Sequence, residues 1–582
     1  MTRILFITVF FILHSSFFIL HSHAIPAKKI PFTVKLSNGD SITVVLTGDE
    51  NFHYIVTLAD GIPVVENEAG EYELRPDLKN EYIERWSAKA RKRNNTRIHK
   101  AAESKARNGA QKSSAYIGEK RGLVILVNFP DLEMSFTSTI DVFNDMFNLK
   151  GYNKNNSTGS IHDYFYDQSY GKFDIEFDIV GPVTTSKGYT YYGENDSEGY
   201  DKHVAELTSE VCQLADPYID FSQYDWDGDG EVEMVYIIYA GYGENSNAGK
   251  STIWPHEWTL SEGAESVPKD GDGAVWLDGV KIDTYAMSCE LRGRTGSTLD
   301  GIGIACHEFS HCLGLPDFYD TSSSGDGEGM GFLDVLDSGS YNGPAAWGGD
   351  APAGYTAYER NFCGWLDFTV LDETCSVTNM PELQDEAIAY VIYNDAHPDE
   401  YFILENRQSN RWFRYVYNNT STHGLLIYHV DYDEYAWQEN LVNAESNHQR
   451  MSYIPAGNFY PSYSYRPVLF PGSYSVSELT DTSHENCGGK LFNANTDGSY
   501  YMHKEITDIE ENDGLISFNF TNYQQKEPDG LENISGDDFK TEPLAQRSQY
   551  YTLDGIKISE PTAPGIYIVK KGDIIRKKLI TR

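Results

Sequence analysis

The chain has little cysteine for its length, with seven residues among 582. Small exported scaffolds that depend on disulfides carry a far higher density of cysteine. The seven are scattered, and an odd number leaves at least one thiol unpaired within the chain. They are Cys212, Cys289, Cys306, Cys312, Cys363, Cys375 and Cys487. A disulfide scaffold is therefore excluded, and the length predicts several structural units that bury their own cores.

Positive charge is also scarce, since 46 Lys and Arg stand against 87 Asp and Glu for a net charge of −41. Nucleic-acid binding depends on basic side chains that neutralise phosphates, so this balance argues against nucleic acid as a partner. In residues 85–120, in contrast, Lys and Arg clearly outnumber Asp and Glu. In so acidic a chain, that stretch predicts a solvated linker open to trypsin-like cleavage.

Long apolar runs are absent beyond the amino terminus. Residues 1–24 combine an early Arg3, an apolar run and a small-residue end, which predicts a signal peptide cleaved near Ala24. The alternative is a membrane anchor, but His14, Ser15 and Ser16 interrupt the run and leave it short for a span. We therefore expect a protein that is secreted or held at the cell surface, without stable membrane insertion.

The pattern along the rest of the chain predicts a multidomain α+β protein. Residues 25–84 alternate apolar and polar side chains between Asn-Gly and Asp-Gly turns, as a small β-rich unit does. Residues 121–368 alternate strand and helix patterns, which favours an α/β domain, and we expect this to be the catalytic domain. Short strands between turns predict a β-sandwich over 369–522, a polar linker over 523–545 and a β module over 546–582. A small unit, a cleavable linker and a large domain together are typical of a zymogen.

The stretch "HEFSHCLGLPD" predicts a metal centre. His307 and His311 are four residues apart, so on a helix they project from one face and can share a cation. Neutral imidazoles suit Zn²⁺, and a catalytic zinc needs a third protein ligand and a position for water. Glu308, beside them, is the candidate general base that takes the proton of that water.

The third ligand is predicted to be Asp317. Gly314 is suited to end the helix in a left-handed turn, and Pro316 prevents helical continuation. Asp317 then stands where the metzincin pattern has its last histidine, and a carboxylate is an acceptable zinc ligand. A chance H-E-x-x-H on a surface helix is the alternative, which the added glycine and aspartate disfavour.

The stretch "DWDGDGEVE" predicts a structural calcium site. Asp225, Asp227 and Asp229 alternate as in the first part of an EF-hand loop, and Glu233 takes the ninth position. The twelfth position is Tyr236 rather than glutamate, so the loop is not a complete EF-hand. Three close carboxylates repel one another without a cation. A solvated acidic turn is the alternative.

These motifs resemble the M6 family of metallopeptidases, the secreted enzymes similar to immune inhibitor A. The resemblance rests on "HEFSHCLGLPDFYD", "SIHDYFYDQSYGKF", the aspartate-rich stretch and "DVLDSGSYNG". It implies a metzincin-like catalytic domain, an N-terminal propeptide and cleavage of protein or peptide substrates. It further implies that His307, His311 and Asp317 bind zinc and that Glu308 is the general base.

The chain departs from this family in one place and adds a module in another. The methionine expected in a turn beneath the zinc falls at Leu336, with Met330 as an alternative. Residues 546–582 are similar to the sorting domains of type IX secretion, which implies the secretion machinery as a partner. An ordinary β accessory module is the alternative. Residues 25–120 contain no cysteine, so a thiolate cannot provide latency.

Two functions remain open at the level of the sequence. The first is a secreted zinc endopeptidase made as a zymogen. The second is an exported, calcium-stabilised binding or adhesive protein whose peptidase domain is vestigial. Glu308 favours the first, because a vestigial site does not need a carboxylate that is not a ligand.

Overall fold

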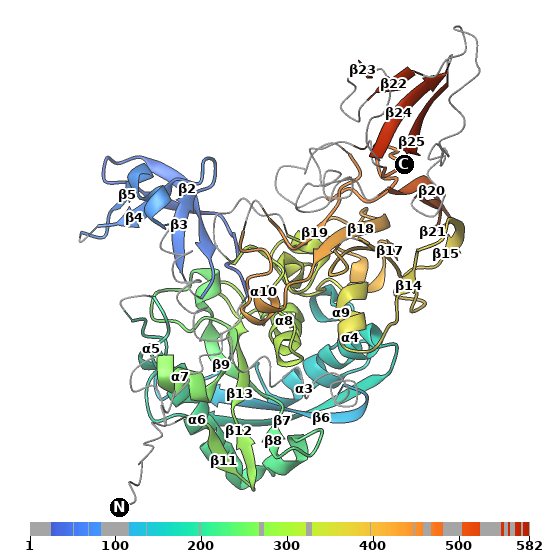
Figure 1. The fold of residues 1–582 in the computed structure, drawn as a ribbon. Helices are drawn as coiled ribbons and strands as arrows, with labels where there is room; N and C mark the ends of the chain where they lie inside the picture. The colour runs from blue at the N-terminus through green and yellow to red at the C-terminus, as the bar shows by residue number, and fades with distance from the viewer. Residues whose placement is uncertain are drawn as a thin grey trace, which may run out of the picture.

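The computed structural model describes most of the chain (Figure 1). The described ranges are 25–82, 116–266, 273–321, 329–445, 448–457, 467–480 and 503–523, without residues 51, 68, 136, 197, 198 and 396, together with residue 483 and four strands between 549 and 580. The expected signal peptide, nearly all of the basic linker, all but residue 523 of the polar linker, and Cys487 lie outside the described residues.

The first unit is a five-stranded antiparallel meander in which each strand pairs with the next. Its strands are β1 (Phe32–Lys35), β2 (Ser41–Gly48), β3 (His53–Thr57), β4 (Pro63–Glu66) and β5 (Tyr72–Leu74). Gly39 and Gly61 have φ of +93° and +61°, as the Asn-Gly and Asp-Gly turns require. Val34, Val44 and Val64 form a small core of its own.

A five-stranded sheet forms the centre of the next unit, in the order β10-β13-β9-β6-β7. Its strands are β6 (Gly118–Asn128), β7 (Phe173–Thr184), β9 (Val235–Tyr242), β10 (His256–Thr259) and β13 (Thr284–Leu291). All neighbours are parallel except β10, which runs antiparallel to β13 at the edge. Strand β6 begins three residues before the expected boundary at residue 121.

Helices cover both faces of this sheet, because its inner strand β6 is apolar on both sides. In β6, Val124 and Leu126 belong to one core cluster, whereas Leu123 and Ile125 belong to another. The first cluster includes side chains of α3 (Ile140–Asn148), α4 (Ile161–Gln168), α8 (Ile302–Cys312) and α9 (Ala357–Phe362). The second includes side chains of α5 (Tyr189–Tyr192), α6 (Val204–Ala215) and α7 (Leu260–Ser266). The mixed α/β architecture expected from the sequence is confirmed.

Two further sheets face each other in the region that follows. One contains β14 (Thr369–Val370), β16 (Tyr390–Tyr393), β17 (Glu400–Arg407), β18 (Gly424–Asp431) and β19 (Met451–Tyr453). The other contains β15 (Cys375–Met380), β20 (Lys504–Asn512) and β21 (Leu515–Asn522), and a short helix α10 (Glu434–Gln438) follows β18. Phe402 and Ile427 lie in the core between the sheets, whereas Ile403 and Tyr428 lie in the same cluster as α8. The larger sheet therefore packs on the α/β unit with its other face.

Two smaller sheets complete the part of the chain that the structure describes. The first consists of β8 (Glu231–Val232), β11 (Val275–Leu277) and β12 (Val280–Ile282). The second, near the carboxyl end, has the order β23-β22-β24-β25. Its strands are β22 (Gln549–Tyr551), β23 (Lys557–Ile558), β24 (Gly565–Lys571) and β25 (Ile574–Ile580). Within the described ranges, no helix has the length and apolar character needed to cross a membrane.

Candidate metal centre

Helix α8 is held by close backbone contacts that fix the direction of its histidines. A Cβ on Gly303 would lie 1.8 Å from the carbonyl oxygen of Ser340, so no larger residue fits there without displacing the backbone. The Nδ1 atoms of His307 and His311 donate to the carbonyl oxygens of Val335 and Leu315, at 2.7 and 2.8 Å. These bonds fix the ring orientations, and the two Nε2 atoms lie 3.1 Å apart.

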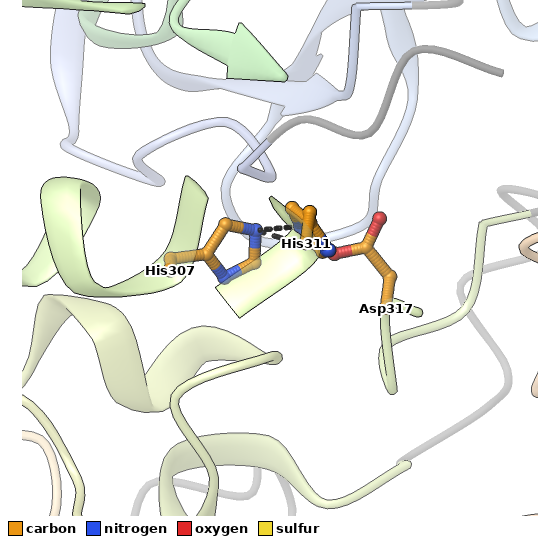
Figure 2. Close-up of side chains that lie close together, drawn as sticks. All are labelled: His307, His311 and Asp317. Atoms are coloured by element: carbon orange, nitrogen blue, oxygen red, sulfur yellow. Dashed lines mark hydrogen bonds and ion pairs between the residues drawn. The ribbon is translucent and has the colours of Figure 1, made fainter. Parts of the chain in front are cut away.

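The turn after α8 brings Asp317 to the same point. Gly314 has φ of +89°, the left-handed conformation that glycine adopts at low cost. The carboxylate Oδ1 of Asp317 lies 3.2 Å from His307 Nε2 and 3.4 Å from His311 Nε2. Figure 2 shows these three side chains converging.

A residue that the sequence did not indicate holds the carboxylate in place. Asn440, in the segment after α10, donates from Nδ2 to Asp317 Oδ2 at 2.7 Å. Its Oδ1 accepts from the main-chain nitrogen of Asp317, also at 2.7 Å. With Oδ2 bonded to Asn440, Oδ1 is the oxygen that faces the histidines. No local pattern marks an asparagine 123 residues away as a partner of this site.

The three side chains fit a zinc ion. Their ligand atoms all lie within 4.8 Å of one another, and each residue is buried. Two imidazole nitrogens and one carboxylate oxygen are ligands typical of catalytic zinc. Because each Nδ1 donates to a backbone carbonyl, each Nε2 is the nitrogen available to a cation.

Burial and neighbouring charges together shift the pKa values of the residues at this centre. Burial lowers the pKa of His307, which favours the neutral form that binds metal. Burial, and then the charge of Asp317, raise the pKa of Glu308 well above its ordinary value. Burial alone would raise the pKa of Asp317, but the neighbouring imidazoles hold it below its usual range. Glu308 Oε2 has no hydrogen-bond partner among the described residues, so one carboxylate oxygen can accept a further proton donor.

Residues 25–28 of the first unit cover the centre. The main-chain nitrogen of Ile25 donates to Glu308 Oε1 at 3.2 Å. Trp254 Nε1 donates to the carbonyl of Ile25 at 3.0 Å, and the hydroxyl of Tyr341 donates to that of Pro26. Glu308 is fully buried beneath this segment, although it lies beside the candidate ligands. Sequence reasoning did not indicate this contact.

The segment that was expected to lie beneath the metal contacts one of the two histidines. Val335 accepts the hydrogen bond of His307, and its neighbour Leu336 is fully buried. The carbonyl of Leu336 accepts from the nitrogen of Phe318, next to Asp317. Met330 is also buried, and its nitrogen donates to Asp337. Of the two candidates, Leu336 therefore lies next to a residue that contacts a ligand.

In the acidic loop, three of the four candidate calcium ligands lie close together. Ligand atoms of Asp225, Asp227 and Asp229 lie within 4.8 Å of one another. Glu233 stands outside this group and accepts from the nitrogen of Trp226 at 2.7 Å. Burial, and then the charges of Asp227 and Asp225, raise the pKa of Glu233 to about 8. Tyr236, the twelfth residue of the loop, is buried in β9.

Comparison with known proteins gives a match over this region of the chain. Residues 111–365 match the family described as immune inhibitor A peptidase M6, catalytic domain. This region thus resembles an M6 peptidase. The chain is 27% identical over 290 residues to the pre-pro-metalloprotease PrtV of Vibrio cholerae, which covers 42% of this chain and 30% of that protein. It is 27% identical over 294 residues to immune inhibitor A of Bacillus thuringiensis subsp. alesti, which covers 43% of this chain and 41% of the relative.

These matches support a metallopeptidase domain over this region of the chain. The matched part spans less than half the length of either relative. The M6 region contains α8, both histidines and Asp317, but it ends before Asn440. The residue that holds the third ligand therefore lies outside the matched region.

Proposed function

We propose that this chain is a zinc-dependent endopeptidase that hydrolyses peptide bonds of protein substrates. The observation that carries the proposal is the convergence of two imidazoles and a carboxylate beside a non-ligand glutamate. The match to M6 catalytic domains supports the same activity. A vestigial domain in a calcium-stabilised adhesive protein is the alternative, and it gives no reason for an intact Glu308.

We assign the residues of the centre two different roles in the reaction, metal binding and proton transfer. His307, His311 and Asp317 would hold the zinc, which supplies a polarised substrate carbonyl and a more acidic water when bound. Glu308 would accept the proton of the attacking water and pass it to the departing amine nitrogen. The 3.2 Å contact between Glu308 and the main-chain nitrogen of Ile25 supports this role, since it shows that a nitrogen donor reaches the carboxylate.

The same contact supports synthesis as a zymogen. Residues 25–28 lie over Glu308, so a substrate cannot approach it while they are in place. The basic linker of residues 85–120 offers bonds for trypsin-like proteases, and their cleavage would separate the first unit from the catalytic domain. A pre-pro form is also part of the name of the relative PrtV.

Replacement of the general base is the decisive test of the activity. After processing in the basic linker, the wild-type chain should hydrolyse casein, and Glu308→Gln should lower kcat by about 10²- to 10⁴-fold with zinc still bound. Glu176→Gln removes an exposed carboxylate of β7 and serves as the control. Chelation should abolish activity and zinc should restore it. Equal activity of Glu308→Gln and the wild type would favour the vestigial alternative.

For the acidic loop we propose a structural calcium ion held by Asp225, Asp227 and Asp229, with Glu233 as a further candidate. Calcium binding would relieve the repulsion among these carboxylates, so added calcium should raise the Tm, and Asp227→Asn should reduce that rise. If Glu233 also binds, calcium affinity should increase as pH rises through about 8, because the ion competes with the proton on its carboxyl. A Tm that does not respond to calcium would identify a solvated acidic turn.

Export completes the proposal. A signal peptide over residues 1–24 would direct the chain out of the cytoplasm, and the module of residues 546–582 would engage a type IX secretion machinery. Deletion of 546–582 should then leave hydrolysis intact and abolish appearance of the enzyme outside the cell. Unchanged export after this deletion would identify an ordinary accessory module.

A further inference from the structure

Lys28 is a cation that is almost completely buried against the catalytic domain. It is 2% exposed, and its Nζ lies 3.0 Å from both carboxylate oxygens of Asp300. The ring of Tyr341 lies beside the same ammonium, 5.4 Å from it. Lysine is rarely buried this far unless an acidic partner is present. The catalytic domain thus provides a closed, negatively charged pocket for one side chain of the covering segment.

The remaining hydrogen bonds between this segment and the domain it covers, apart from the one to Glu308, go to its main chain, although the side chains of Ile25 and Ala27 also pack against apolar clusters. Trp254 and Tyr341 donate to the carbonyls of Ile25 and Pro26, and the carbonyl of Asn245 accepts from the nitrogen of Lys28 at 2.8 Å. Any extended peptide could make these three bonds. The pocket at Asp300, in contrast, recognises the charge of one side chain.

The segment also has a defined register relative to the reaction. The nitrogen of Ile25 lies against Glu308, where the departing amine of a cleaved peptide would receive its proton. Ile25 therefore takes the place of the first residue after the cleaved bond. Counting along the chain, Lys28 takes the place of the fourth.

Asp300 is positioned by the element that also positions the zinc ligands. It directly precedes Gly301, the residue before α8, and its Oδ1 accepts from the nitrogen of Gly301 at 2.9 Å. Arg292 lies 3.7 Å from Asp300 but forms its shorter contacts with Asp350, at 2.6 and 3.0 Å. When Lys28 leaves, Asp300 keeps its longer ion pair with Arg292, and the oxygens that Lys28 contacted face the vacated pocket.

We propose that Asp300 forms a substrate subsite that selects a lysine at the fourth residue after the cleaved bond. This inference rests on the proposed peptidase function, which it extends to a class of substrate. A lysine fits because the pocket already closes on an ammonium at the end of a four-carbon chain. A glutamate at the same position would place two carboxylates together and would be disfavoured.

Matched peptides test the subsite with the processed wild-type enzyme. Two internally quenched peptides would differ in one residue, lysine or norleucine, at the fourth position after a single bond whose cleavage is verified by mass spectrometry. Norleucine keeps the aliphatic chain and removes the charge. We expect kcat/KM to be about tenfold higher for the lysine peptide, the effect of pairing one charge in a partly closed site.

Substitution of Asp300 tests whether its carboxylate causes the preference for lysine. In Asp300→Asn the ratio of the two kcat/KM values should fall to about one, whereas the control Asp216→Asn should keep the wild-type ratio. The ratio does not depend on the amount of active enzyme, and the wild-type comparison stands if the variant fails to fold. Equal cleavage of both peptides by the wild type, or a preference that persists in Asp300→Asn, would overturn the subsite. Cleavage of neither peptide would instead count against the peptidase function.

Discussion

At the scale of the residue, the candidate metal centre includes an asparagine that lies outside the matched residues 111–365. Asn440 bonds both the carboxylate and the main-chain nitrogen of Asp317. A ligand held at two points loses little freedom when it binds a metal, and partners of this kind commonly determine affinity. Asn440 is thus a positioning residue for the third ligand.

Removal of this amide should weaken metal binding. Asn440→Ala is expected to lower zinc affinity by about 10- to 100-fold, because Asp317 is no longer oriented. Competition with a chromogenic chelator measures the affinity directly. Asn419→Ala, in a loop of the β-sandwich region, provides the control, and an unchanged zinc affinity in Asn440→Ala would show that Gly314 and Pro316 orient Asp317 alone.

The sequence indicated the residues of the centre that lie within one local motif. His307, Glu308, His311 and Asp317 were identified because helical spacing and a glycine turn relate them directly. Asn440 and Ile25 were not, because each reaches the centre through the packing of a distant segment. Tertiary contacts of this kind leave no periodic signal in a single sequence.

At the scale of the element, strand β3 connects the first unit to the catalytic domain through one ion pair. His53 Nε2 lies 3.2 Å from Glu244 Oε1, and its ring packs on that of Trp254 at 4.7 Å. Burial alone would lower the pKa of His53, but Glu244, with a smaller contribution from Asp49, raises it above its ordinary value of 6.5. The contact is therefore sensitive to pH.

The direction of this dependence follows from the raised pKa. The folded state binds the proton of His53 more tightly than the unfolded chain, so the stabilisation is complete below about pH 6.5 and is lost as pH rises through the folded value. We expect His53→Gln to lower the Tm of the unprocessed chain by about 2 °C or more at pH 5.5. The difference should be smaller at pH 9, where the ion pair is lost and only the packing of the ring on Trp254 still distinguishes the two chains. A difference that is constant across this range would contradict the ion pair.

Local patterns predicted many elements, whereas their order in space was not predictable. The helix over α3 and the strands β6 and β9 follow from apolar periodicity and buried runs. The order β10-β13-β9-β6-β7 does not, because neighbours in a parallel sheet are joined through helices on either face. The same limit applies to the sheet that contains β17 and β18, because the sequence does not indicate what packs against its second apolar face.

At the scale of the whole molecule, the catalytic domain and the larger β-sheet share one core. The cluster around α8 contains Ile304 and Phe309, and it continues through Ile403 and Tyr428 of the adjacent sheet. The side chain of Arg407 in β17 also donates to the carbonyl of Leu333. A polar surface between independent domains would lack such a shared apolar cluster.

The shared core predicts a single cooperative unit. A chain that ends at residue 368 should expose the apolar face that β17 and β18 now cover, and we expect it to aggregate or to unfold at least about 10 °C below the longer chain. A chain that ends at residue 522 should unfold in one calorimetric transition, apart from the first unit. Two separate transitions for the catalytic and β-sandwich regions would contradict the shared core.

The position of Asn440 decides which part of this protein could be transplanted. Residues 111–365, the stretch that resembles other peptidases, would carry both histidines and Asp317 into a host protein. They would not carry Asn440, whose amide bonds Asp317, or the sheet that packs against α8. A segment moved to another protein with its candidate metal centre intact would therefore have to extend beyond residue 440. The region matched by sequence similarity ends earlier, at residue 365.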